Sequence, residues 1–378
     1  MGAIGIVAEY DPFHSGHKHH INAARAALGA DLPVVCAMSG NWTQRGSAAI
    51  ADKWTRARLA LLGGADLVLE LPTPWAAASA ERFARGAVEL LNMTGVVDTI
   101  CFGSESGDLS ELEGAVAALD GPDYPERRRA ELGRGEPYAA ARAAAAGCPC
   151  LDGPNNNLAV EYLRALRRLN SGMRPFTVPR LGDGHNAALS GGGHPSASAL
   201  RALLRAGDGR VWDYLDPAAR ESLEGGLADL ERAFPAILAR LRTLSPAELA
   251  RIPDCGEGLE NRLLAAAGRA RSLTELYDLA KSKRYAHARI RRVVLRAFLG
   301  VYELPEQVPY LRVLGMNGRG QALLREMRGL PVITKPAHGR GQPLLEAEAR
   351  YTDLYALCFD PIRPAGLEWT PSPVIQKD

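Results

Sequence analysis

The sequence predicts an α/β fold, in which a doubly wound parallel sheet of five strands is followed by a mainly α-helical C-terminal domain. Short apolar runs alternate with helical patterns over residues 1–205, which is typical of a parallel sheet covered on both faces. Helical patterns dominate over residues 206–378. A chain of 378 residues, 47% hydrophobic and 23% charged, is long enough for two such globular domains.

The first domain is expected to contain five strands, each a short apolar run. These runs span residues 3–8, 33–38, 65–71, 97–102 and 175–182. Helical patterns occur at residues 17–28, 49–62, 77–91 and 125–147. Asn155 or Asn156 is a natural N-cap for a further helix, and Ser196 or Ser198 for another that follows a Gly-rich loop.

The second domain is expected to be helical over most of its length. Its helical patterns lie at residues 218–241, 245–251, 258–272, 273–282 and 287–300. The tail, residues 311–378, mixes short helices with Pro-rich connections. We find no internal repeat.

Charge and cysteine content limit the class of protein. The net charge is only +2, but residues 251–300 hold eleven Lys/Arg against five Asp/Glu, which permits an anionic partner. Cys148 and Cys150 stand too close for a zinc knuckle, and no second pair follows them, so we expect no bound metal. The chain has no signal-peptide pattern and no apolar run of the roughly 20 residues that a membrane span needs. We therefore expect a reduced, cytoplasmic protein.

A histidine-rich segment, IVAEYDPFHSGHKHH, joins the first predicted strand to the first helix. Anions bind at helix N-termini, because free N–H groups and a partial positive charge meet there. Gly16 allows a ligand to approach the backbone, and His14 and His17 lie on one side of the first turn, where both can donate to phosphate oxygens. A zinc site would need further converging ligands. A solvated helix start remains the alternative.

Two later segments are compatible with a nucleotide site. CFGSES, residues 101–106, ends the fourth strand, where Gly103 and Ser104 could approach a nucleotide; the alternative is a simple strand-exit turn. SASALR, residues 196–201, places Ser196, Ser198 and Arg201 on one helical turn, which suits a triphosphate; the alternative is a plain capped helix. The HxGH spacing of His14 and His17 is that of nucleotidyltransferases, in which a nucleophile attacks the α-phosphate of ATP and pyrophosphate leaves.

Several segments together resemble the bacterial tRNA(Met) cytidine acetate ligase family. They are GIVAEYDPFHSGH, SGNWTQRGSAAIADKWTRARLALLGGADLVLELP, CFGSES, PNNNLAVEYLRAL, PRLGDGHN, SASALR, RYAHARIRRVVLRAFLGV and PYLRVLGMNGRGQALL. The resemblance implies a HIGH-type, Rossmann-like nucleotidyltransferase domain with a helical C-terminal part. It further implies that ATP, with Mg²⁺, activates acetate as acetyl-adenylate, and that the acetyl group passes to N4 of the wobble cytidine of elongator tRNA(Met).

The resemblance also implies site residues. The ATP site would comprise Val7, Ala8, Glu9, Tyr10, Phe13, His14, Gly16, His17, His20, Gly103, Asn155 or Asn156, and Arg180, to which we add Ser196 and Ser198. His14, His17 and Lys53 are the expected catalytic residues, and Arg45 is a candidate contact for acetate, phosphate or tRNA. The chain has Asp11 where the family usually has Asn, and Asn157 where the family usually has an aliphatic residue. Asp11 would either bind through Mg²⁺ or point away.

A basic segment of the second domain fits a tRNA partner. Its charged residues are Lys281, Lys283, Arg284, Arg289, Arg291 and Arg292. They could neutralise phosphates, while Tyr285 among them could stack on a base. A solvated basic helix is the alternative.

Two other functions compete with this one. A small-molecule adenylyltransferase of coenzyme A or NAD biosynthesis would share the HxGH site, but it would not need the helical domain or the basic segment. A non-catalytic RNA-binding protein could keep a relic nucleotide fold, although the intact histidine pair argues against decay.

Overall fold

The computed structural model describes residues 2–136, 138–180, 195–223, 225–327 and 331–377. The five predicted strands are present as β1 (Ala3–Ala8), β2 (Val34–Ser39), β3 (Leu67–Leu71), β4 (Val97–Ser104) and β5 (Arg174–Pro179). They pair in parallel in the order β5-β4-β1-β2-β3, so the strand order reverses between β1 and β4. This is the predicted doubly wound arrangement, and ligands bind such sheets where the order reverses.

Alternate side chains of each strand enter different cores, as the two-residue period of a strand requires. Ile4 and Ile6 of β1 join the cluster that contains Ile21 of α1 (Ser15–Leu28) and Leu59 of α2 (Lys53–Leu62). Ala3, on the opposite face, joins the cluster beneath α4 (Ala80–Met93) and α8 (Pro154–Arg168). The sheet is therefore covered on both faces, which explains its continuous apolar strands.

Some helix boundaries differ from the prediction. The single helix expected over residues 125–147 is two, α6 (Tyr124–Gly133) and α7 (Tyr138–Ala146), which follow α5 (Leu109–Asp120). A positive φ of 85° at Gly135 ends the first of them.

The N-cap of α8 is Gly153, so neither Asn155 nor Asn156 caps that helix. By contrast, Ser196 caps α9 (Ala197–Ala206) as predicted, because its side chain accepts a hydrogen bond from the Ala199 N–H. The predicted strand end at residues 181–182, the rest of the PRLGDGHN segment and the Gly-rich loop at residues 190–194 lie outside the described residues.

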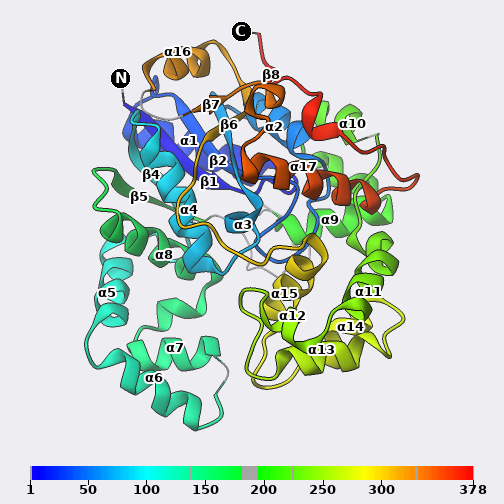
Figure 1. Ribbon diagram of the computed structural model, residues 1–378. Helices are drawn as coiled ribbons and strands as arrows, with labels where there is room; N and C mark the ends of the chain where they lie inside the picture. The colour runs from blue at the N-terminus through cyan, green and yellow to red at the C-terminus, as the bar shows by residue number, and fades with distance from the viewer. Residues whose placement is uncertain (1, 137, 181–194, 224, 328–330, 378) are drawn as a thin grey trace.

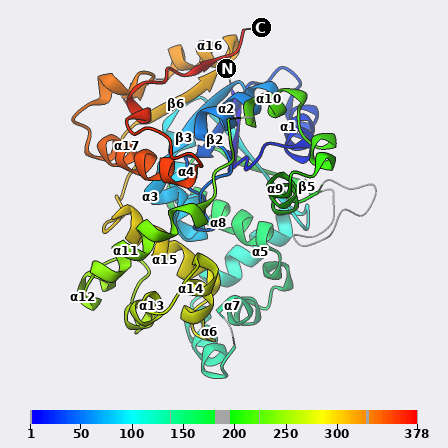
Figure 2. The ribbon, with the colours of Figure 1, turned by 90° about the vertical axis from the view of Figure 1, so that its right-hand side faces the viewer.

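The following helices form a lobe with its own core. They are α11 (Phe234–Thr243), α12 (Pro246–Ala250), α13 (Leu259–Ala267), α14 (Leu273–Ala280) and α15 (His287–Leu299), whereas α10 (Pro217–Leu223) packs in the cluster that contains α1 and α2. Ile237, Leu263, Leu276 and Val293 meet in that core. In Figures 1 and 2 this lobe and α6–α7 lie at the end of the molecule opposite the two chain termini.

The tail returns to the sheet, which the sequence analysis did not predict. β6 (Leu311–Met316) pairs antiparallel with β3, and β7 (Val332–Ile333) and β8 (Val374–Ile375) pair with β6. α16 (Gly318–Glu326) and α17 (Pro343–Tyr355) lie between these strands in the chain, and the short α3 (Thr73–Ala76) follows β3. The prediction that the tail holds only short helices and connections was thus wrong, because a six-residue apolar run does not by itself distinguish a strand from a helix. No helix in the described ranges is long and apolar enough to cross a membrane.

Candidate active site

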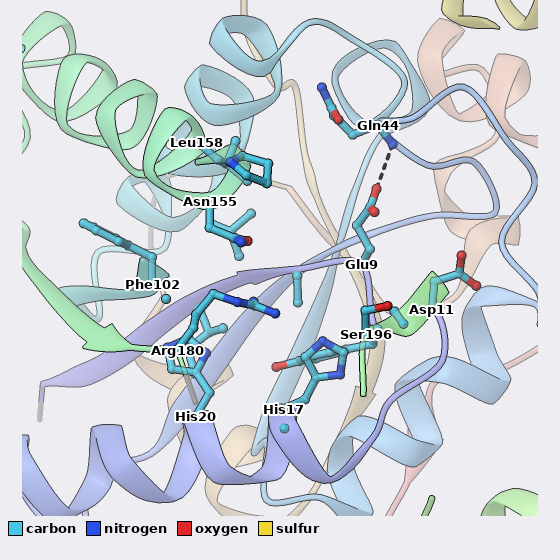
Figure 3. Close-up of a pocket in the computed structure, with 18 of the residues that line it drawn as sticks. Glu9, Asp11, His17, His20, Gln44, Phe102, Asn155, Leu158, Arg180 and Ser196 are labelled. Atoms are coloured by element: carbon cyan, nitrogen blue, oxygen red, sulfur yellow. Dashed lines mark hydrogen bonds between the residues drawn. The ribbon is translucent and has the colours of Figure 1, made fainter. Parts of the chain in front are cut away.

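A cavity of about 730 Å³ opens at the carboxyl ends of β1 and β4, where the strand order reverses. The start of α1, the loop between β2 and α2, the start of α8, the end of β5 and the start of α9 complete its wall. Figure 3 shows side chains from these separate elements converging on one space. The predicted ATP-site residues that line it are Val7, Ala8, Glu9, Tyr10, His14, Gly16, His17, His20, Gly103, Asn155, Arg180, Ser196 and Ser198.

His14 and His17 form a reciprocal cap at the start of α1. The Gly16 N–H donates to His14 Nδ1 at 3.1 Å, and the His14 N–H donates to His17 Nδ1 at 3.3 Å. The two rings lie 3.9 Å apart, centroid to centroid, and the His17 ring also packs edge-on against Tyr10. These contacts fix both ring orientations, as a catalytic site requires.

The same hydrogen bonds fix the tautomers. Because each Nδ1 accepts a backbone N–H, the proton of each neutral ring lies on Nε2. Burial, with His14 and Arg180 nearby, holds the pKa of His17 well below its usual value. Burial also lowers the pKa of His20 to about 4, and its Nε2 lies 3.2 Å from Cys101 Sγ. The lowered pKa keeps the His17 ring neutral, with Nε2 as its donor.

The start of α9 provides a second helix N-terminus on the cavity. Ser196 is its N-cap, and Ser198 Oγ lies 3.1 Å from Arg201 Nη2. Arg180, at the end of β5, is exposed and packs close to Gly103, where a Cβ would lie 3.3 Å from Arg180 Cγ. Arg45, Arg180 and Arg201 line the cavity together with two helix N-termini, an arrangement that suits a polyphosphate.

The sequence that forms this site matches a known family. The family model described as HIGH Nucleotidyl Transferase matches residues 1–367. The tRNA(Met) cytidine acetate ligase of Acetivibrio thermocellus is 35% identical over 99% of this chain and all of that protein. The chain belongs to the tRNA(Met) cytidine acetate ligase family. The corresponding ligase of Syntrophotalea carbinolica is 42% identical over 88% of this chain and 85% of that protein.

Two solved structures of this family have the same fold. Thermotoga maritima TmcAL bound with alpha-thio ATP superposes with a TM-score of 0.90 at 29% identity, and the apo form with 0.93 at 30% identity. Each comparison covers 100% of both chains.

Asp11, where the resemblance implies an asparagine, finds its partners within the protein. Asp11 is buried, and its Oδ1 accepts a 2.6 Å hydrogen bond from the Ile50 N–H. Arg201 lies 3.3 Å from Oδ2 and also donates to the Asp11 main-chain oxygen. The negative charge of Asp11 is thus paired with Arg201. Asn157, where the resemblance implies an aliphatic residue, lies on the cavity wall. Its Nδ2 donates to the Gly153 main-chain oxygen at 3.0 Å.

Lys53, expected to be catalytic, lies outside the cavity. Its side chain is fully buried, with Nζ 2.6 Å from Glu70 and 2.7 Å from Glu368. Burial disfavours its charge, but Glu368 and Glu70 outweigh that effect and raise its pKa. Lys53 is held by two carboxylates in the interior and does not line the cavity, so its position gives no support to the expected catalytic role.

Two of the expected ATP contacts are also structural. Phe13 is buried beneath Tyr10, with ring centroids 4.9 Å apart. Asn156 Oδ1 accepts the Glu105 N–H at 2.8 Å, and its Nδ2 donates to the Cys150 oxygen. Both support the wall from behind. Of the two asparagines left open by the sequence, Asn155 is the one that lines the cavity.

The loop between β2 and α2 lines the cavity but was largely missed. Its cavity residues are Thr43, Gln44, Arg45 and Ser47, of which only Arg45 had been a candidate. The sequence could have predicted these residues, because the end of β2 must lie beside the end of β1 in this topology. The backbone of this loop also packs on α15, where a Cβ at Gly46 would lie 2.6 Å from the Arg292 nitrogen.

The basic segment lies on α15 and the turn that precedes it. Lys281, Lys283, Arg284 and Arg291 are exposed. Arg289 is half-buried, 3.1 Å from Glu257, and burial lowers the pKa of Arg292 to about 10. Tyr285 is buried, with its hydroxyl donating to the Glu257 oxygen, so it cannot stack on a base as expected.

Within the described residues, no group of three or more His, Cys, Asp or Glu could hold a metal ion. The Asp11 oxygens are already engaged by Ile50 and Arg201. The carboxylate of Asp11 therefore does not fit the role of Mg²⁺ ligand.

Proposed function

We propose that this chain is an ATP-dependent tRNA(Met) cytidine acetate ligase, which makes N4-acetylcytidine at the wobble position of elongator tRNA(Met). The observation that carries the proposal is the reciprocal cap of His14 and His17, whose rings line a cavity at the strand-order reversal. The names of its relatives give the substrate, and the ATP analogue bound by a solved relative supports the nucleotide.

In the first step, a carboxylate oxygen of acetate attacks the α-phosphorus of ATP. The new P–O bond gives acetyl-adenylate, and the bond to the β-phosphate breaks with release of pyrophosphate. His14 and His17 donate from Nε2 to the phosphoryl oxygens, where negative charge increases, and the N-termini of α1 and α9 act in the same direction. Arg180 and Arg45 are further cations at the cavity for phosphate or acetate.

Binding of ATP changes the protonation of this site. Burial, with His14 and Arg180 nearby, holds the pKa of His17 well below its usual value, so the ring is neutral. A polyphosphate brings negative charge, which favours the charged imidazolium. Mg²⁺ that accompanies ATP is expected to depend on phosphate oxygens, the ligands it commonly takes from nucleotides.

In the second step, the cytidine N4 attacks the acetyl carbonyl carbon and AMP leaves. Acetate needs this activation because it has a poor leaving group, and the cytidine amine is a weak nucleophile because its lone pair is delocalised. The anticodon loop presents the base outside a helix. The exposed lysines and arginines of α15 and its preceding turn bind the tRNA backbone, and a tRNA substrate agrees with the cytoplasmic location predicted above.

The test is an assay with ATP, acetate and bulk tRNA, read out as pyrophosphate release and as nucleosides after digestion. We expect pyrophosphate release that depends on acetate, and N4-acetylcytidine in elongator tRNA(Met). ATP consumption without acetate or tRNA would instead indicate a small-molecule adenylyltransferase. Binding of tRNA with ATP left intact would indicate a non-catalytic RNA-binding protein.

A further inference from the structure

Acetyl transfer to a cytidine requires a base. As N4 forms its bond to the acetyl carbon, the C–O bond to AMP breaks and the electron pair leaves with the phosphate oxygen. The amine nitrogen must then lose a proton. A side chain that accepts it has to lie in the cavity, within hydrogen-bond reach of the amine, and has to be unprotonated at the working pH.

Among the described residues, three carboxyl groups line the cavity: Glu9, Asp11 and Glu105. Both oxygens of Asp11 are engaged, one by the Ile50 N–H and the other by Arg201. Both oxygens of Glu105 are engaged at the start of α8, one by Asn155 and the other by the Asn156 N–H. Neither carboxylate can take up a substrate proton without giving up a structural contact.

Glu9 is different. Its Oε1 accepts the Gln44 N–H at 2.7 Å, and its Oε2 accepts no hydrogen bond from any described residue. Figure 3 shows the side chain rising from the end of β1 toward Gln44, on the side of the cavity occupied by the loop between β2 and α2. One oxygen thus fixes the carboxylate, and the other remains for a substrate.

The position of Glu9 suits the second step. His14, six residues after the end of β1, is the N-cap of α1 and marks the phosphate side of the cavity. The loop between β2 and α2, whose Gln44 N–H donates to Glu9, packs on α15 at Arg291 and Arg292. An RNA bound along α15 would therefore reach the cavity beside Glu9, with the adenylate held on the other side.

We propose that Glu9 is the general base that accepts the N4 proton during acetyl transfer. This assignment rests on the proposed function and names a residue for its second step. The charged and titratable groups that face Glu9 are Asp11, Arg45, Arg201 and Tyr162. Burial is the main reason that the pKa of Glu9 lies above its usual value, and Asp11 adds to the shift. A raised pKa makes the carboxylate a stronger base than a surface glutamate.

The experiment compares Glu9→Gln with the wild-type protein in two assays. Acetate-dependent exchange of pyrophosphate into ATP reports the first step, and single-turnover formation of N4-acetylcytidine reports the second. The glutamine keeps an oxygen for the Gln44 N–H, so the loop retains its contact. We expect the transfer rate to fall by about 100-fold or more, the usual contribution of a general base, and exchange to fall by much less than transfer. Glu126→Gln, at an exposed carboxyl group on α6, is the matched control.

The pH dependence provides a readout that a structural role would not change. Protonated Glu9 cannot accept a proton, so the wild-type transfer rate should rise with pH and level off above the raised pKa of Glu9. The residual rate of Glu9→Gln should lack this rise, and Glu9→Asp should restore part of it.

Three results would overturn the assignment. Equal loss of exchange and transfer in Glu9→Gln would make Glu9 a nucleotide-positioning residue, and unchanged transfer would remove it from the reaction. A wild-type protein that forms no N4-acetylcytidine would overturn the proposed function itself, and the base assignment with it.

Discussion

Two groups of polar residues lie at the carboxyl ends of β1 and β3, which β2 separates in the sheet, and only one of the two groups faces a cavity. At the end of β1, the polar side chains of Glu9, His14 and His17 face a cavity. At the end of β3, Glu70 is shut in an interior cluster with Lys53 and Glu368. The difference is that the C-terminal tail covers β3: β6 pairs with it, and Glu368 comes from the tail. The carboxyl end of a parallel strand is thus a ligand site only where the rest of the chain leaves it uncovered.

The charged groups of the β3 cluster and of the β1 cavity differ in what they face. The β3 cluster also includes Arg312 on β6, and Glu348 on α17, whose pKa burial and Glu70 raise to about 8. Its charges are satisfied mainly by one another, so it joins the tail to the sheet. The cations at the β1 cavity face a space large enough for a nucleotide. The predictions below test this division, beginning with the largest effect.

Replacement of His14 should break the β1 site without unfolding the protein. We expect His14→Ala to reduce acetate-dependent pyrophosphate exchange by about 10³-fold, because a donor to the developing phosphoryl charge is lost. Binding of tRNA should survive. His14→Asn keeps a capping acceptor for the Gly16 N–H, so it separates the cap from the chemistry. Recovery of exchange in His14→Asn would show that the cap alone mattered.

Replacement of Lys53 should lower the stability of the protein and leave the β1 site intact. Lys53→Met removes the cation that lies between the buried Glu70 and Glu368 and leaves Arg312 as the cation of the cluster, and loss of one partner from such a cluster costs about 3–5 kcal/mol in unfolding free energy. Chemical denaturation measures this loss, and exchange per folded molecule should stay close to wild-type. The double variant Lys53→Met/Glu70→Gln should recover part of the stability. Full stability with lost exchange would return Lys53 to the active site.

Charge reversal on the basic segment should affect the RNA alone. We expect the double variant Arg284→Glu/Arg291→Glu to weaken tRNA binding by about tenfold or more and to flatten its salt dependence, because both side chains are exposed and two phosphate contacts are lost. Exchange without tRNA should not change. Arg319→Glu on α16, at the opposite end of the molecule, is the matched control. Equal weakening by that control would place the tRNA elsewhere.

The smallest effect is expected at Asp11. Asp11→Asn keeps an oxygen for the Ile50 N–H, and Arg201 can still donate to the main-chain oxygen of residue 11. We therefore expect thermal unfolding to report a stability change within about 1 kcal/mol, with ATP bound slightly more tightly because one negative charge is removed. A large loss of ATP binding would show instead that the Asp11–Arg201 pair positions α9.

The sequence by itself determined the elements whose signal is local. The five parallel strands follow from short apolar runs between helical patterns, and the phosphate side of the cavity follows from HxGH at a strand-to-helix junction. A serine cap at the start of α9 was readable for the same reason, although the structure decided for Ser196 over Ser198. Each of these depends on residues that are close together in the chain.

Only the tertiary structure decided which polar residues face a ligand and which face one another. Lys53 and Tyr285 have the sequence surroundings of functional residues, but partners from other elements bury them. The tail is fixed by contacts such as Asn41 Nδ2 to Thr352 Oγ1, between residues 311 positions apart. Local periodicity carries no information about such a contact, because the chain between the two residues can place them together or apart with the same pattern of apolar and polar positions.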